Sequence, residues 1–263
     1  MRIRSTYFIL LFLLWSATGF SNPAAETRVK VLLQQANQLM DSAKDNKALQ
    51  TYEEAIALDP GCYEALWKAS YLKNRIGLRY SDEVSKLLSF QKAWTYADAA
   101  LCANPDDAEG NYVMALSVYN KAMVSGVKER MLRTNDIKFF LDKALKDNPE
   151  HAAAWQLLGR WNYRNANLSM PERTALNMFF GGVPLEASNE KAMEALQNAI
   201  QYDPKNISSY YDLATVYMEM DKPDLCQVTL QEAMELELRT SEELQISKRC
   251  KLMLERIEKH AKI

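Results

Sequence analysis

The stretch Ala55-Ile56-Ala57-Leu58-Asp59-Pro60 recurs in similar form three more times along the chain, each time with an alanine five residues before a proline. The other copies are residues 100–105 (ALCANP), 144–149 (ALKDNP) and 199–204 (AIQYDP). The small alanine lets a neighbouring helix approach closely, and the proline cannot continue the helix that it follows. Each copy therefore predicts the end of one helix and, after the proline, the start of another.

These junctions divide the chain into five expected helix pairs. The first helix of each pair is expected over 28–41, 63–75, 108–124, 152–166 and 207–220, and the second over 46–58, 82–103, 135–147, 189–201 and 223–238. The repeats are thus 28–60, 63–105, 108–149, 152–204 and 207–238. An amphipathic segment over 241–260 follows, and we expect it to cap the last apolar face. The fourth repeat carries the largest insertion.

The helices that follow the junctions carry a recognisable pattern. Trp155, Leu158 and Gly159 in the fourth repeat match the spacing W-x-x-L-G-x-x-Y, and Tyr210, Leu213, Ala214 and Tyr217 match it in the fifth. In this pattern the chain resembles the tetratricopeptide repeat. The resemblance implies an all-α fold, a tetratricopeptide-like helical-hairpin solenoid of about five repeats plus a C-terminal capping helix, in one domain over residues 22–263.

The fourth repeat and its insertion resemble a narrower family. The residues are Leu158-Gly159-Arg160-Trp161-Asn162-Tyr163, then Leu168-Ser169, Glu172-Arg173, Phe180-Gly181-Gly182-Val183-Pro184 and Ala187-Ser188. This order is similar to the regulator of microtubule dynamics family, with Met170-Pro171 where that family has a tryptophan. Together with the N-terminal segment described below, which indicates export, the resemblance implies an exported bacterial member of a family whose animal members associate with microtubules, some of them implicated in phospholipid binding. An exported chain does not meet tubulin, so we do not expect a microtubule role.

The composition favours a folded, helical chain. Of its 263 residues, 48% are hydrophobic, 25% are charged and 8 are glycine. The formal net charge is −2, with 32 basic and 34 acidic residues. Nucleic-acid binding depends on a basic excess that this chain lacks, so no nucleic-acid partner is expected.

The N-terminus has the layout of a secretory signal peptide. Arg2 and Arg4 precede an apolar run from Tyr7 to Trp15, and small residues follow up to Ser21. We expect residues 1–21 to be a cleaved signal peptide and the mature protein to be periplasmic or secreted, with no membrane span left. A retained membrane anchor is the alternative, although the apolar run is shorter than the roughly 18 residues that a spanning helix needs.

The sequence offers little for catalysis. The two histidines, His151 and His260, have no metal-ligand spacing and are expected on the solvated surface. No Ser, Cys or Lys lies in a recognisable nucleophile motif. We therefore expect no enzyme activity, no cofactor and no metal.

The first helices of such repeats line a concave surface, and the repeat register nominates the residues that face it. The nominated partner-binding residues are Trp67, Tyr71, Arg75, Tyr112, Tyr119, Gln156, Arg160, Tyr163, Arg164 and Tyr211. Aromatic rings give contact area at low entropic cost, and arginines bind carboxylate or phosphate. The alternative is that the rings pack against one another, and that Arg160 and Arg164 pair with Glu172 or a neighbouring helix.

The sequence thus predicts an exported scaffold that binds a protein or peptide on this aromatic, arginine-containing face. A carrier of a lipid or another hydrophobic small molecule, with residues 167–187 as a lid, is the second hypothesis. An anionic small molecule is a further candidate partner.

Four cysteines allow two disulfide bridges. Helix register suggests Cys62 with Cys102 and Cys226 with Cys250, because each pair lies at a matching height on two packed helices. Four reduced cysteines are the alternative, since helical repeats need no covalent links.

Overall fold

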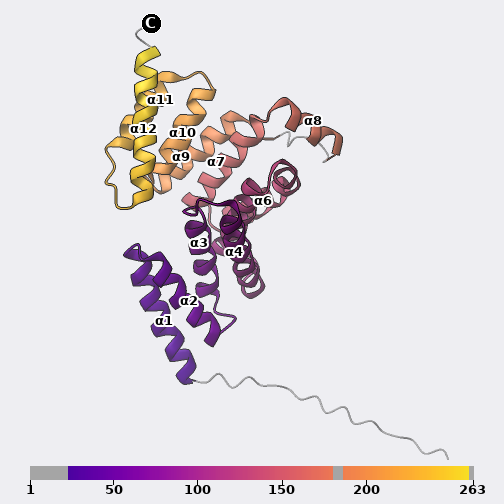
Figure 1. Ribbon diagram of the computed structural model, residues 1–263, viewed down its shortest axis with the longest axis vertical. Coiled ribbons are helices and arrows are strands. Elements are labelled where there is room, and N and C mark those ends of the chain that lie inside the picture. The colour runs from indigo at the N-terminus through magenta and orange to yellow at the C-terminus, as the bar shows by residue number, and fades with distance from the viewer. Residues whose placement is uncertain (1–22, 180–185, 261–263) are drawn as a thin grey trace, which may run out of the picture.

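The computed structural model describes residues 23–179 and 186–260, and all regular structure within these ranges is helical. Figure 1 shows the helices stacked one after another along a curved path, with the C-terminal helix at one end. The helices are α1 (Pro23–Asp41), α2 (Asp45–Leu58), α3 (Tyr63–Gly77), α4 (Glu83–Ala103), α5 (Ala108–Val124), α6 (Val127–Asp147), α7 (Ala152–Ala166), α8 (Met170–Phe179), α9 (Asn189–Tyr202), α10 (Ile207–Glu219), α11 (Pro223–Met234) and α12 (Ser241–His260). The predicted all-α class is confirmed.

The four Ala-to-Pro junctions end helices α2, α4, α6 and α9, as the sequence predicts. At each junction the backbone N–H of the residue before the proline donates to the carbonyl of the alanine, over 2.8–3.0 Å. The alanines Ala55, Ala100, Ala144 and Ala199 are fully buried. The motif therefore closes a helix and places its smallest side chain where another helix packs.

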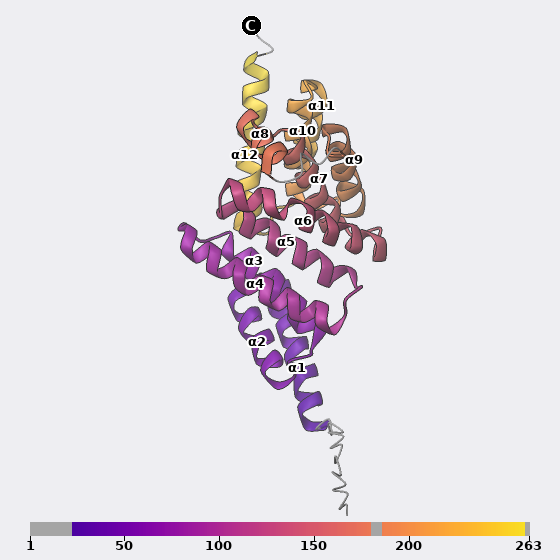
Figure 2. The ribbon, with the colours of Figure 1, turned by 90° about the vertical axis from the view of Figure 1, so that its right-hand side faces the viewer.

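Successive helices form hairpins that stack into a solenoid. The pairs are α1 with α2, α3 with α4, α5 with α6, α7 with α9, and α10 with α11, and α12 packs on both α10 and α11. The first helices of neighbouring hairpins also touch, from α3 to α5, to α7, to α10 and to α12. Figure 2 shows the same stack from the side. The predicted helical-hairpin solenoid with a capping helix is confirmed.

Helices α7 and α9 approach closely at Gly159 on α7. A Cβ atom placed on this glycine would lie 2.5 Å from Cγ of Leu196 on α9. That distance is too short for any real contact, so a side chain here would force the two helices apart. The glycine of the repeat pattern is thus explained by helix packing.

Helix α6 begins at Val127, eight residues before the expected start at Asn135. Within the part of the helix that precedes the expected start, Thr134 Oγ1 donates to the carbonyl of Arg130 over 2.8 Å. Its hydroxyl is satisfied inside the helix, which therefore continues through this point.

Helix α11 ends at Met234, four residues before the expected end at Leu238. Leu236 and Leu238 still pack on the core formed by α9 to α12, but from a turn rather than from a helix.

The insertion in the fourth repeat contains a helix, α8, that the sequence analysis did not predict. At its start Glu172 Oε2 accepts from the backbone N–H of Ser169 over 3.1 Å and from its hydroxyl over 2.7 Å, as the glutamate of a capping box accepts from the N-cap residue. The sequence Ser169-Met170-Pro171-Glu172 was a usable signal, with proline in the first turn.

The expectation that His151 is a solvated surface residue is wrong. Its side chain is 9% exposed, its Nδ1 accepts from the backbone N–H of Ala154 over 3.2 Å, and its ring lies 4.7 Å from that of Tyr112. His151 is the N-cap of α7, and this cap holds it against the core.

All four cysteines are free thiols in the structure, so neither suggested bridge is formed. Cys226 and Cys250 are buried, and burial raises the pKa of each thiol to about 11. Both are therefore protonated near neutral pH and act as small apolar side chains.

The expected signal peptide, residues 1–21, lies outside the described residues. Among the helices of residues 23–179 and 186–260, none combines the length and apolar character needed to cross a membrane.

Candidate functional site

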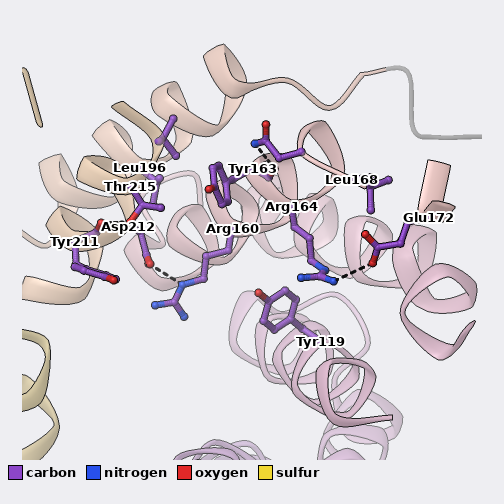
Figure 3. A pocket seen from close by; sticks show the side chains of 12 residues that line it. Tyr119, Arg160, Tyr163, Arg164, Leu168, Glu172, Leu196, Tyr211, Asp212 and Thr215 are labelled. Carbon is purple, nitrogen blue, oxygen red and sulfur yellow. Dashed lines mark hydrogen bonds and ion pairs between the residues drawn. The ribbon is translucent and has the colours of Figure 1, made fainter. Parts of the chain in front are cut away.

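A cavity of about 380 Å³ opens among the ends of α5, α7 and α10, with parts of α8 and α9 at its edge. Figure 3 shows the side chains that point toward it. Its lining residues are Tyr119, Arg160, Tyr163, Arg164, Asn167, Leu168, Glu172, Leu196, Tyr211, Asp212, Thr215 and Val216. We call it the α7–α10 cavity. Two arginines and three tyrosines beside aliphatic side chains can contact both an anionic and an apolar group.

Arg160 is held firmly by α10. Its Nε donates to Asp212 Oδ2 over 2.6 Å and its Nη2 donates to Ser208 Oγ over 2.7 Å. The same oxygen of Asp212 accepts from Gln156 Nε2 over 2.8 Å. Burial alone would lower the pKa of Arg160, but Asp212 outweighs it and raises this pKa. Arg160 is a charged cross-link between α7 and α10.

Arg164, one turn further along α7, is held much more loosely. Its Nη2 lies 3.6 Å from Glu172 Oε1, beyond normal hydrogen-bond length, although its side chain is no more exposed (36%) than that of Arg160 (35%). The same Glu172 oxygen accepts from Arg130 Nη2 over 3.2 Å. Hydrogen bonds from Ser169 and then from Arg130 hold the pKa of Glu172 below its usual range, so it is ionised at neutral pH.

The tyrosines supply the apolar surface and neutral hydroxyls. Burial raises the pKa of the phenol of Tyr119 and that of Tyr163. Both hydroxyls therefore stay protonated near neutral pH and can donate hydrogen bonds. Tyr211 lies on the α10 side of the cavity, and Tyr119 lies beyond the arginines on α5.

Five of the ten nominated residues line this cavity, namely Tyr119, Arg160, Tyr163, Arg164 and Tyr211. Their convergence from three helices is what the repeat register predicts. Both ion pairs of the alternative interpretation are also formed, Arg160 with a neighbouring helix and Arg164 with Glu172.

The remaining nominated residues lie elsewhere. Tyr112 and Gln156 are buried, so their assignment to an accessible face is corrected. Trp67 and Tyr71 are partly buried against the core. Arg75 pairs with the buried Asp45 over 3.0 Å. The register counts positions along each helix, whereas the curvature of the stack decides which of them remain accessible.

Sequence reasoning missed Asp212 and Arg130. Asp212 pairs with a residue 52 positions away, and Arg130 reaches Glu172 from 42 positions away. Neither separation follows a helical period, so no local pattern points to these contacts.

Within residues 23–179 and 186–260, no group of three or more His, Cys, Asp or Glu side chains is placed to hold a metal ion.

Two solved structures have a shape similar to that of this chain. A thermophilic TPR protein from Thermus thermophilus has a TM-score of 0.61 and 18% identity, covering 86% of this chain and 98% of the other. The Pseudomonas aeruginosa protein pilF has a TM-score of 0.54 and 11% identity, covering 89% and 90%. At these identities the likeness shows the fold alone.

Sequence relatives point to one family. Regulator of microtubule dynamics protein 1 of Pongo abelii is 27% identical over 225 residues, covering 84% of this chain and 70% of the relative. The Mus musculus protein of the same name is 25% identical, covering 84% and 72%. Regulator of microtubule dynamics protein 3 of Rattus norvegicus is 27% identical, covering 82% and 46%. The profile described as Regulator of microtubule dynamics protein 1-3 matches residues 32–258, and the chain therefore belongs to this family.

Proposed function

We propose that the protein is an exported scaffold that binds an acidic segment of a partner protein in the α7–α10 cavity, on the concave face of its solenoid. The observation that carries the proposal is the difference between the two arginines. Arg160 makes two short bonds, whereas Arg164 lies 3.6 Å from its carboxylate partner. Arg164 is the cation that a partner's carboxylate can reach.

The hydrogen bonds of Arg160 give it a structural role, whereas those around Arg164 leave it able to bind a partner. Displacing Asp212 from Arg160 would also leave Gln156 without its acceptor. Each buried polar group left unpaired costs about 1–3 kcal/mol. Glu172 makes its shorter bonds to Ser169 and to Arg130, so giving up Arg164 costs it less.

The role we infer is binding rather than catalysis. The phenols of Tyr119 and Tyr163 have raised pKa values, and the carboxyl of Glu172 has a lowered one. Each shift moves the pKa of the group further from neutral pH, whereas a general acid or base needs a pKa near neutral pH. The cavity is therefore suited to bind a charged group through side chains whose own charge does not change near neutral pH.

Affinity capture from the native host tests the proposal. Arg164→Ala should lose most of the partner recovered by the wild-type protein, at unchanged helicity by circular dichroism. Arg133→Ala is the matched control, because Arg133 is an exposed, ion-paired arginine on α6 outside the cavity. Equal recovery with both variants would contradict the proposed site.

A lipid or hydrophobic carrier is the second candidate, favoured by the aliphatic side chains of Leu168, Leu196 and Val216 in the cavity. Its volume, about 380 Å³, is near the lower end of small-molecule sites, roughly 300–1,000 Å³. Part of the suggested lid, residues 180–185, lies outside the described residues. Mass spectrometry of extracts from the purified native protein would reveal a bound lipid, and its absence would leave the scaffold proposal.

Export is proposed from Arg2, Arg4 and the apolar run that follows them. N-terminal sequencing of the mature protein tests it. A mature chain that begins near residue 22 supports export, and an intact Met1 contradicts cleavage.

A further inference from the structure

Helix α8 is attached to the solenoid through few side chains. Leu176 is 3% exposed and Glu172 is mostly covered, whereas Met170 and Met178 are 74% and 68% exposed. The two covered side chains are four positions apart, so they lie on one face of the helix. The attachment of α8 thus has an ionic part and an apolar part.

The ionic part is a carboxylate facing two arginines. Glu172 Oε1 lies 3.2 Å from Arg130 Nη2 and 3.6 Å from Arg164 Nη2, while Oε2 caps the start of α8. The Nε of Arg130 is buried and has no hydrogen-bond partner. A single oxygen of Glu172 therefore faces the guanidinium groups of both arginines, and the buried Nε–H of Arg130 has no acceptor. The two arginines have more hydrogen-bond donors than Glu172 can pair with.

The apolar part lies beside it. Leu176 lines a hollow formed with Met131, Ile137 and Trp161, and only about 20 Å³ of it remains unfilled. Arg130, Arg164 and Glu172 line the same hollow. A side chain of leucine size fits it, and the charged site lies at its edge.

We propose that α8 occupies, within its own chain, a docking site for a partner helix that carries Glu-x-x-x-Leu, with Ser or Thr three residues before the Glu. This deepens the proposed function and rests on it, because the acidic segment proposed above is then a helix that displaces α8. The partner's Glu would form ion pairs with Arg164 and Arg130, and its Leu would fill the hollow beside Met131 and Trp161. The occupant is argued from α8 itself, whose Ser169, Glu172 and Leu176 have this spacing.

Because α8 is covalently joined to its site, it should weaken the binding of any partner helix to that site. A segment joined to its site acts at a high effective concentration, of millimolar order for a short flexible link. A partner must compete with this occupant, so the wild-type protein binds more weakly than a variant whose α8 is weakened.

The test uses a synthetic peptide of residues 167–179, labelled with fluorescein, and fluorescence polarisation. The protein is the full chain, either wild type or with Glu172→Gln and Leu176→Ser. Gln keeps an oxygen that can accept from the Ser169 N–H, so the double variant loses the charge and the apolar contact while the start of α8 is kept. We expect the peptide to bind the double variant about tenfold more tightly than the wild type.

Two controls address specificity. A peptide carrying both substitutions should not bind, and Arg164→Ala added to the double variant should weaken binding about tenfold or more, as loss of a charge-assisted contact does. Circular dichroism checks that each variant keeps the helicity of the wild type.

Equal affinity for wild type and double variant would overturn the occupancy of the site by α8. Absence of binding to both would overturn the docking site itself. Neither result bears on the capture experiment with Arg164→Ala and Arg133→Ala, so failure of this inference and failure of the proposed function are distinguishable.

Discussion

Arg79, two residues after α3, pairs with Glu242 in the first turn of α12, 163 positions further along the chain. Arg79 also contacts the buried Asp45 at the start of α2, over 2.5 Å. One side chain thus connects the first, second and last parts of the solenoid. Figure 1 shows the turn between α1 and α2 facing the start of α12.

Removing this link should loosen the curl of the solenoid with little loss of stability. Glu242→Ala leaves both arginine contacts of Asp45 intact, and an exposed ion pair contributes about 0–1 kcal/mol. We expect a larger radius of gyration in small-angle scattering and a nearly unchanged melting temperature. One molar salt should expand the wild type in the same way, because it screens the pair.

Glu258→Ala, an exposed acid near the other end of α12, is the control and should change neither quantity. An unchanged radius for Glu242→Ala would show that helix packing alone sets the curvature.

Gly159→Ala should destabilise the fold by about 1–3 kcal/mol, since its Cβ would meet Leu196 at 2.5 Å. Urea unfolding measures the free energy. Gly61→Ala is the matched control, because its Cβ would find only an ordinary contact with Asp59 at 3.5 Å. Equal stability of the two variants would refute the close approach of α7 and α9.

Asn74→Ala should also destabilise the fold, because buried polar side chains link α3 and α5. Asn74 Nδ2 donates to Ser117 Oγ over 2.8 Å, and Asn120 Nδ2 donates to Asn74 Oδ1 over 3.0 Å. The substitution leaves Asn120 without this acceptor, at a cost of about 1–3 kcal/mol. Urea unfolding checks it, and a loss below about 0.5 kcal/mol would mean that the buried groups find other partners.

The attachment of α8 should weaken in acid. Hydrogen bonds from Ser169 and Arg130 lower the folded-state pKa of Glu172, so its contribution is present above the unfolded value of about 4.3 and is lost as the pH falls through the folded pKa. Hydrogen exchange of residues 170–179, corrected for intrinsic rates, should rise below about pH 4. In Glu172→Gln this pH dependence should disappear, and a persistent dependence would point to another group.

The Ala-to-Pro junctions predicted most of the fold because they are local. The buried alanine and the backbone N–H that donates to its carbonyl lie within five consecutive residues, as at Ala55 and Asp59. Helix α8 has an equally local signal in Ser169 and Glu172, within the insertion of the fourth repeat.

The site was harder to predict because it depends on distant pairs. The repeat register predicted that Tyr119, Arg164 and Tyr211 face the same surface, and all three line one cavity. The register could not predict the ion pair between Arg160 and Asp212. It also nominated Tyr112, which the packing of His151 covers. Helix periodicity specifies a face, and only the stacking of the hairpins specifies what covers that face.

Photocrosslinking in the native host tests the central claim most directly. A photoreactive amino acid replaces Tyr211 in the α7–α10 cavity or, as the matched position outside it, the exposed Val228 on α11. The account predicts one defined protein adduct from position 211 that Arg164→Ala reduces, and no such adduct from position 228. A partner that crosslinks from position 228 and not from position 211 would contradict it.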